Sequence, residues 1–155
     1  MLTLRLCRAG LLPILLFALI LSAGCGSKEP APVDPAAVKN GLVGKVWSCE
    51  AMFEREVRGE APMTLEFLAD GTVKGNGGCN DFSGQYTLDG DSLSFGPFVS
   101  TKKACGPATD EQEYAFMTFL PRISRVEVDD DELHLFSEET PLPMAFSSGG
   151  GGLFW

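Results

Sequence analysis

Few side chains in this sequence could carry out chemistry, since it contains one histidine and five cysteines. His134 lies between Leu133 and Leu135 in a run that alternates as a β-strand does, so it points to the face opposite the two leucines. This position predicts a surface imidazole rather than a general base. A serine or cysteine nucleophile would have only this one imidazole as its base, and no nucleophile motif surrounds it. We therefore expect no catalytic residues and no enzymatic activity.

The sequence indicates no metal or cofactor site either. No cysteine and histidine have the spacing of a zinc site. The acidic run 129–132 lacks the spacing and the glycine of a calcium loop. Gly75 and Gly77 resemble the start of a dinucleotide-binding loop, but Asn80 stands in place of the third glycine and no helix follows. We expect neither a metal nor a cofactor.

The cysteines have to be read with the compartment, which the first 25 residues indicate. A basic start is followed by an apolar run from Leu11 to Leu21, too short to span a bilayer as a mature helix, and then by Ser-Ala-Gly before Cys25. This resembles a bacterial lipoprotein signal, in which the cysteine is acylated and becomes the new N-terminus. The alternative is an ordinary secretory signal with a chance cysteine. We expect Cys25 to be lipidated and to anchor the protein in the cell envelope, in the outer membrane facing the periplasm.

The rest of the chain divides by composition. Residues 1–24 are the expected signal peptide, and residues 25–41 form a proline-rich tether with too little apolar surface to order itself. Residues 42–148 are enough for one core and too few for two. The glycine-rich end, residues 149–155, is expected to be a flexible tail.

The net charge limits the partners. The full sequence carries 12 basic and 21 acidic side chains, a net charge of −9. Loss of the signal removes Arg5 and Arg8, which leaves 10 basic against 21 acidic side chains and a net charge of −11. A protein this acidic is not expected to bind nucleic acid or an anionic lipid surface. The charge serves solubility or the recognition of a cationic partner.

The elements that must position any site read as short strands and one helix. Alternation and Asp-Gly turns predict strands over 45–50, 64–68, 72–74, 84–88 and 92–95, and again over 123–128, 132–136 and 143–146. A capping box at Thr109 starts a helix whose inward stripe contains Glu113, Phe116, Met117 and Leu120, and Pro121 ends it. The expected fold class is α+β, a small antiparallel β-sheet or barrel-like meander with one covering helix.

The stretch 75–86 is the most unusual part of the sequence, because glycines and asparagines separate two predicted strands there. Such a cluster in a β region predicts a sharp corner or bulge in which a glycine adopts positive φ. We expect the corner to be structural first. The residues available for contact with a partner are then Gly78, Asn80, Asp81 and Tyr86.

Five motifs occur in an order that resembles META-domain proteins, a family that includes the HslJ-like bacterial lipoproteins. They are Gly78-Cys79-Asn80, the run 84–88, Phe95-Gly96-Pro97, the run 100–105 and Glu111-Gln112-Glu113. The resemblance extends from about Trp47 to Phe146. It implies a small α+β domain in envelope proteins tied to stress and drug tolerance, with no established catalysis. Asp81 stands where the family more often has a basic residue.

Three cysteines, Cys49, Cys79 and Cys105, remain in an oxidising space once the signal is removed and Cys25 is acylated. We expect a Cys79–Cys105 disulfide, because both residues flank turns and both lie in the family-like motifs. Cys49 shares a strand face with Trp47 and is expected to be a buried thiol. Three free thiols are the alternative.

Two functions follow as expectations. The first is a non-enzymatic, membrane-anchored lipoprotein that meets an unidentified envelope protein during stress. The second is a periplasmic inhibitor of a cationic hydrolase such as lysozyme, which the negative charge would steer toward the protein. The run 82–86 has the Ser-Gly-x-x pattern of an inhibitor loop.

Overall fold

The computed structural model describes residues 33–53, 55–57 and 61–149. The expected signal peptide, Cys25, the first part of the tether and the last six residues lie outside this range. Within the described residues, no helix is both long enough and apolar enough to cross a membrane.

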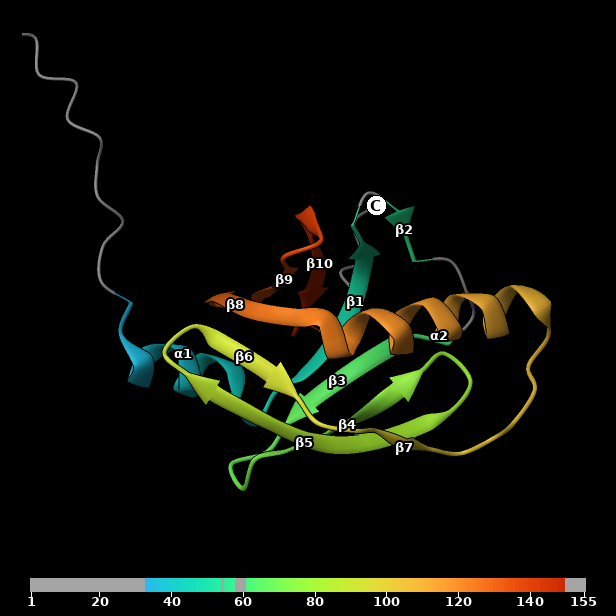
Figure 1. Cartoon of the computed structure of the whole chain (residues 1–155), viewed down its shortest axis with the longest axis horizontal. Coiled ribbons are helices and arrows are strands. Elements are labelled where there is room, and N and C mark those ends of the chain that lie inside the picture. Colours follow the sequence, from blue (N-terminus) through green and yellow to red (C-terminus); the bar gives the residue numbers. More distant parts are fainter. Residues whose placement is uncertain (1–32, 54, 58–60, 150–155) are drawn as a thin grey trace, which may run out of the picture. The chain divides into compact units, whose positions relative to one another are not determined.

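Eight strands form a closed antiparallel barrel (Figure 1). Hydrogen bonding joins them in the order β1-β3-β4-β5-β6-β8-β9-β10, and β10 pairs back with β1 to close the barrel. The expected α+β class with a barrel-like antiparallel meander is therefore confirmed. The strands are β1 (Val46–Met52), β3 (Met63–Phe67), β4 (Thr72–Gly77), β5 (Asp81–Asp89), β6 (Ser92–Phe95), β8 (Ile123–Asp129), β9 (Glu132–Ser137) and β10 (Thr140–Ser147).

Two short strands that the sequence does not predict lie beside the barrel wall. The strand β2 (Arg55–Glu56) pairs with β1, and β7 (Val99–Ser100) pairs with β5. Two residues are too few to show an alternating pattern, so neither strand has a local signal.

Two helices accompany the barrel where the sequence analysis expected one. Residues assigned to the tether form α1 (Pro35–Leu42), whose N-cap Asp34 accepts a hydrogen bond from the Ala36 backbone N–H. Leu42 at its end is fully buried, and its carbonyl accepts from the Trp47 indole N–H at 3.0 Å. The tether prediction was therefore wrong over 35–41. A short amphipathic segment gains its stability from packing on the barrel, which its composition does not reveal.

The second helix, α2 (Pro107–Phe119), begins earlier than the capping box predicted and continues into the 3₁₀ turn η1 (Leu120–Arg122). Gly106, at φ +106°, is the N-cap and Pro107 is the first helical residue. Proline suits that position because its missing N–H would have no helical partner. The Asp110 carboxylate accepts instead from the Cys105 backbone N–H at 2.9 Å.

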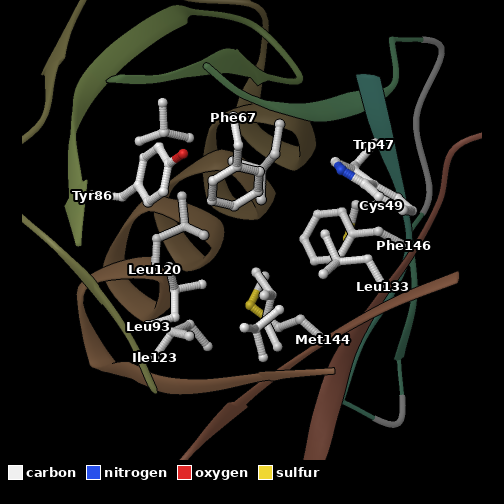
Figure 2. Close-up of a cluster of buried hydrophobic side chains, with 14 of the residues drawn as sticks. Trp47, Cys49, Phe67, Tyr86, Leu93, Leu120, Ile123, Leu133, Met144 and Phe146 are labelled. Carbon is white, nitrogen blue, oxygen red and sulfur yellow. The ribbon is translucent and has the colours of Figure 1, made fainter. Parts of the chain in front are cut away.

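The core fills the barrel interior (Figure 2). Alternate residues of the strands point inward, and in β3 these are Met63, Leu65 and Phe67, all fully buried. Phe116 enters this core from α2, with its ring 6.0 Å from Phe82 and 6.3 Å from Phe146. Burying one such ring stabilises the fold by about 1.5–3 kcal/mol, so α2 is held to the barrel by its apolar face.

Candidate functional site

The glycine corner between β4 and β5 is a tight turn built by Gly78, Cys79 and Asn80. The Gly77 N–H donates to the Asn80 carbonyl at 2.8 Å, and the Gly78 N–H donates to the Asn76 side-chain oxygen at 2.7 Å. Gly78 has φ +103°, which an L side chain rarely adopts. At Gly77 an added Cβ would lie 2.6 Å from the Glu113 Oε1 atom, so the Glu113 side chain would have to move to admit it. Gly78 therefore has the positive φ that the sequence predicts for one glycine of this corner, and Gly77 packs against the Glu113 side chain.

Asn80 is 6% exposed and is the most heavily bonded side chain of the corner. Its Oδ1 accepts from the Lys103 backbone N–H at 2.7 Å and from the Thr101 hydroxyl at 2.8 Å. Its Nδ2 donates to the Lys103 carbonyl at 3.2 Å and to Glu113 Oε2 at 2.6 Å. The Asn80 backbone N–H donates to Glu113 Oε1 at 2.6 Å. All four hydrogen-bonding positions of the amide are therefore used within the protein.

These contacts, which we call the Asn80 bridge, join three parts of the chain. The amide oxygen holds the segment 101–103 that follows β7, while the amide nitrogen and the backbone N–H hold Glu113 on α2. In Figure 1 the chain leaves β7 and loops to the N-terminal end of α2. The Asn80 bridge fixes both ends of this loop against the barrel.

The expected disulfide reinforces the same region. Cys79 and Cys105 are bonded, with their Cα atoms 5.9 Å apart, which confirms the pairing predicted from the sequence. Cys49 is free and buried, also as expected. Burial, and secondarily the charge of Glu50, raises the pKa of the Cys49 thiol from 9.0 to about 12. A thiol held protonated in this way is a poor nucleophile at neutral pH.

A groove of about 310 Å³ opens beside the bridge, and we call it the Asn80 groove. The buried residues Asn80 and Phe82 lie at its base, Ser100 of β7 lines it, and Tyr114 and Met117 line it from α2. A shallower hollow of about 290 Å³ shares Phe82 and Ser100 with the groove and includes Val99 of β7. The two hollows are therefore neighbours that meet at Phe82 and Ser100.

The charged side chains of these two hollows are mostly acidic. Asp110, Glu113 and Lys103 line the Asn80 groove, and Asp81 lines the shallower hollow. The Lys103 ammonium lies 3.7 Å from the Asp81 carboxylate, and both side chains are largely exposed. Three carboxylates against one ammonium give the pair of hollows a net charge of −2.

The structure places the sequence-predicted contact residues differently from one another. Asp81 is exposed at the rim of the hollow, whereas Gly78 and Asn80 are buried. Tyr86 is not available for contact with a partner, because it is buried in the barrel. Its hydroxyl donates to the Leu68 carbonyl at 2.8 Å, and its ring packs edge-on against Phe67. Burial and the nearby charge of Asp70 raise the pKa of Tyr86. Its prediction as a partner contact was wrong, because an inward-facing position on β5 is satisfied by the core.

Three residues of this site, Glu113, Val99 and Tyr114, were not predicted from the sequence. One signal was present for Glu113, because a carboxylate in the inward stripe of a helix needs a buried partner. Val99 and Tyr114 are 71% and 74% exposed, the most exposed large apolar side chains in the described part of the chain. No periodic pattern marks them, since a side chain on a two-residue strand or an outer helix face has no local constraint.

A second groove, of about 510 Å³, lies apart from the family-like motifs. Met52, Phe53, Phe119 and Leu142 give it an apolar lining, and Arg55 and Glu139 lie at its edge. Phe53 has φ +61°, and its ring packs edge-on against Phe119 at 4.7 Å. Over residues 33–53, 55–57 and 61–149, no group of three or more histidine, cysteine or acidic side chains is arranged to hold a metal ion.

Comparison with known proteins gives a family and several similar solved structures. The META domain model matches residues 40–147. An NMR structure of a protein from Burkholderia xenovorans is 28% identical and has a TM-score of 0.64, with 79% of this chain and 93% of that chain covered.

Two further relatives show likeness of fold alone. A second NMR structure is 19% identical with a TM-score of 0.58, and the alignment covers 75% of this chain and 95% of that chain. A crystal structure of a DUF4847 family protein from Bacteroides vulgatus is 14% identical with a TM-score of 0.55, and the alignment covers 74% of this chain and 99% of that chain. No curated protein matches the sequence.

Proposed function

This chain belongs to the META domain family, and on that basis we propose that it is a non-enzymatic lipoprotein of the bacterial envelope that acts in stress or drug tolerance through contacts with other proteins. The matched residues include all eight barrel strands and the Asn80 bridge. The resemblance of the motifs to HslJ-like lipoproteins, and the signal-like segment that ends at Cys25, support an anchored form facing the periplasm.

The observation that carries the proposed location is the Cys79–Cys105 disulfide. Disulfides persist in oxidising compartments such as the bacterial periplasm and are rare in the cytosol. The bond closes a loop across 26 residues of sequence separation, from the glycine corner to the start of α2. A location in the periplasm would supply the oxidising conditions under which this bond forms.

The chemistry of the site supports a role in contact rather than catalysis. The Asn80 amide and both Glu113 oxygens are engaged with each other or with the backbone. The sole histidine, His134, lies opposite Glu127 on β8 and Ala145 on β10 in the sheet register, with its ring 6.4 Å from that of Phe136. It belongs to the barrel wall and is absent from the lining of the Asn80 groove.

A second candidate function, inhibition of a cationic hydrolase such as lysozyme, is favoured by the net charge of −2 in the two hollows. Such a charge would attract a basic enzyme and would lose its effect as salt is raised. Titration of the purified protein into a muramidase assay separates the two candidates, because an envelope protein without this role leaves the hydrolysis rate unchanged.

Complementation tests the proposed function. A deletion strain is challenged with envelope stress and given back either the wild-type gene or a version that carries an ordinary secretory signal in place of residues 1–25. The proposal expects full rescue by the wild type and weak rescue by the unanchored form. Equal survival of the deletion and wild-type strains under every envelope stress applied would contradict the proposal.

A further inference from the structure

Strand β7 presents an unpaired edge to the Asn80 groove. In the β5–β7 pair, Phe82 faces Ser100 and Ser83 faces Val99, and the Thr101 N–H donates to the Asp81 carbonyl at 3.0 Å. Antiparallel pairs alternate between hydrogen-bonded and non-hydrogen-bonded positions. Ser100 therefore occupies a non-hydrogen-bonded position, and its backbone N–H and C=O point away from β5. Among the described residues, none forms a hydrogen bond with these two groups.

The opposite wall of the groove is formed by side chains of α2. Tyr114 and Met117 line the groove from this side, so a segment lying between β7 and α2 would meet a strand edge on one side and a helix on the other. Tyr114 and Val99, at 74% and 71% exposure, leave apolar area uncovered on both sides of the Ser100 edge. An open strand edge with exposed apolar side chains is a template for pairing, which proteins usually shield with charge or a covering element.

The walls are held in place before any partner arrives. The Asn80 amide oxygen fixes the segment 101–103 that continues β7, and its amide nitrogen fixes α2 through Glu113. The Cys79–Cys105 disulfide ties the same loop to the glycine corner. A preformed groove loses little conformational entropy on binding, so more of the contact energy contributes to affinity.

We propose that the Asn80 groove binds an extended segment of a partner polypeptide, which pairs with the Ser100 edge of β7 and carries lysine or arginine side chains. Addition of a strand to an open edge is an established mode of peptide recognition, with main-chain bonds for affinity and side-chain contacts for selectivity. The basic side chains complement Asp81, Asp110 and Glu113, which outnumber Lys103. Lys102 is exposed on the same segment but lines neither hollow. The inference rests on the proposed function in protein contacts and assigns it a surface.

The test uses a defined probe, an eight-residue peptide of alternating lysine and threonine with blocked ends and a fluorescent label. Its binding to the full-length protein in detergent micelles is measured by fluorescence anisotropy. Two control peptides are a version with glutamate in place of lysine and a version N-methylated at every residue, which cannot donate main-chain hydrogen bonds. The proposal expects saturable binding of the probe, weakened at least tenfold in both controls. Binding of either control as tight as that of the probe overturns it, and so does a probe that does not bind.

Variants of the protein locate the site. Ser100→Pro removes the outward N–H and leaves the ladder bonds of Val99 and Thr101, and it is expected to weaken probe binding at least tenfold. Tyr114→Lys places a positive charge on the other wall at a residue that is 74% exposed, so folding is unaffected and probe binding is expected to be lost. Asp110→Asn keeps the acceptor for the Cys105 N–H and is expected to weaken binding severalfold at low salt. Asp129→Asn, outside both hollows, is the matched charge control and is expected to bind as the wild type does.

The results separate this inference from the proposed function. If Tyr114→Lys and Ser100→Pro bind the probe as the wild type does, the groove assignment is overturned, whatever the stress phenotype. If both variants lose the probe yet rescue the deletion strain as fully as the wild type, the groove's part in that function is overturned and the function itself stands. Loss of both probe binding and rescue supports the two together.

Discussion

Asn80 and Glu113, 33 residues apart in sequence, face each other through two hydrogen bonds of 2.6 Å. The backbone N–H of Asn80 meets one oxygen of the carboxylate and the side-chain N–H meets the other. Because hydrogen bonds to a charged acceptor are roughly twice as strong as neutral ones, this pair is a strong tie between the barrel and α2. The Asn80 amide oxygen at the same time holds the chain at Thr101 and Lys103.

The first prediction concerns the loss of this tie. Asn80→Ala removes one hydrogen bond from the Glu113 carboxylate, two from the Lys103 backbone and one from the Thr101 hydroxyl at a buried position. We therefore expect a loss of about 3 kcal/mol in the free energy of unfolding. Chemical denaturation measures it, with Asn40→Ala on an exposed position of α1 as the control. An unchanged denaturation midpoint for Asn80→Ala would show that the Asn80 bridge contributes nothing to stability.

An exchange of charge tests the bridge more specifically. Asn80→Asp sets a carboxylate against that of Glu113, and the repulsion is expected to destabilise the protein further at neutral pH. Adding Glu113→Gln restores a donor opposite an acceptor, and we expect the double variant to be more stable than Asn80→Asp alone. The double-mutant cycle gives the coupling energy. A coupling energy near zero would contradict direct contact between the two side chains.

The second prediction concerns the glycine corner. Gly78→Ala places a side chain at φ +103°, which should cost about 1–3 kcal/mol of stability. Gly77→Ala should destabilise for a different reason, because its Cβ would displace the Glu113 carboxylate. Gly149→Ala has open space around it and is the matched control. From the sequence, Asn80→Ala is expected to cost less than Gly78→Ala. Because the Asn80 side chain forms four hydrogen bonds in the structure, we expect the opposite order in the melting temperatures.

The third prediction concerns the thiols. Under native conditions we expect none of Cys49, Cys79 and Cys105 to react with an alkylating reagent, and after unfolding without reductant only Cys49 to react. Peptide mapping by mass spectrometry identifies the labelled residue. Reduction of the disulfide should lower the free energy of unfolding by about 3.5 kcal/mol on the chain-entropy model. Labelling of Cys79 or Cys105 in the unfolded, unreduced protein would contradict the pairing.

The fourth prediction concerns alkaline pH. Since burial raises the pKa of Cys49 from 9.0 to about 12, the folded protein keeps a proton that the unfolded chain loses. The stabilising effect is fully present below about pH 9 and is lost as the pH rises toward 12. We expect the free energy of unfolding to fall across this window in the wild type and to fall less steeply in Cys49→Ala. Parallel pH profiles for the two proteins would show that the thiol does not titrate differently on folding.

The fifth prediction concerns attachment. Cys25 lies outside the described residues, and its acylation remains a prediction from the sequence. Cys25→Ser should move the protein from the membrane fraction to the soluble envelope fraction, because acyl chains supply about 0.8 kcal/mol of membrane affinity per buried methylene. Fractionation and mass spectrometry of the N-terminus measure the outcome. A Cys25→Ser variant that still pellets with membranes would count against lipid anchoring.

The sequence by itself determined the eight barrel strands, the existence of α2 and the Cys79–Cys105 pairing. Strand alternation and Asp-Gly turns are local signals, since each depends on residues only a few positions apart. The need for positive φ at the glycine corner is equally local, because it concerns one backbone dihedral at Gly78. The pairing of the cysteines was predicted because both residues flank turns and both lie in the family-like motifs.

Only the tertiary structure decided how the barrel closes and which side chains come into contact across it. The pairing of β10 with β1 closes the barrel, and closure determines how deeply each residue is buried. Tyr86 is therefore a core residue and Asp81 a rim residue. The meeting of Asn80 with Glu113, and the position of Ser100 between Val99 and Tyr114, depend on where α2 crosses the barrel wall. That crossing is set by the packing of Phe116 among Phe82 and Phe146, side chains distant in sequence, and no local pattern encodes it.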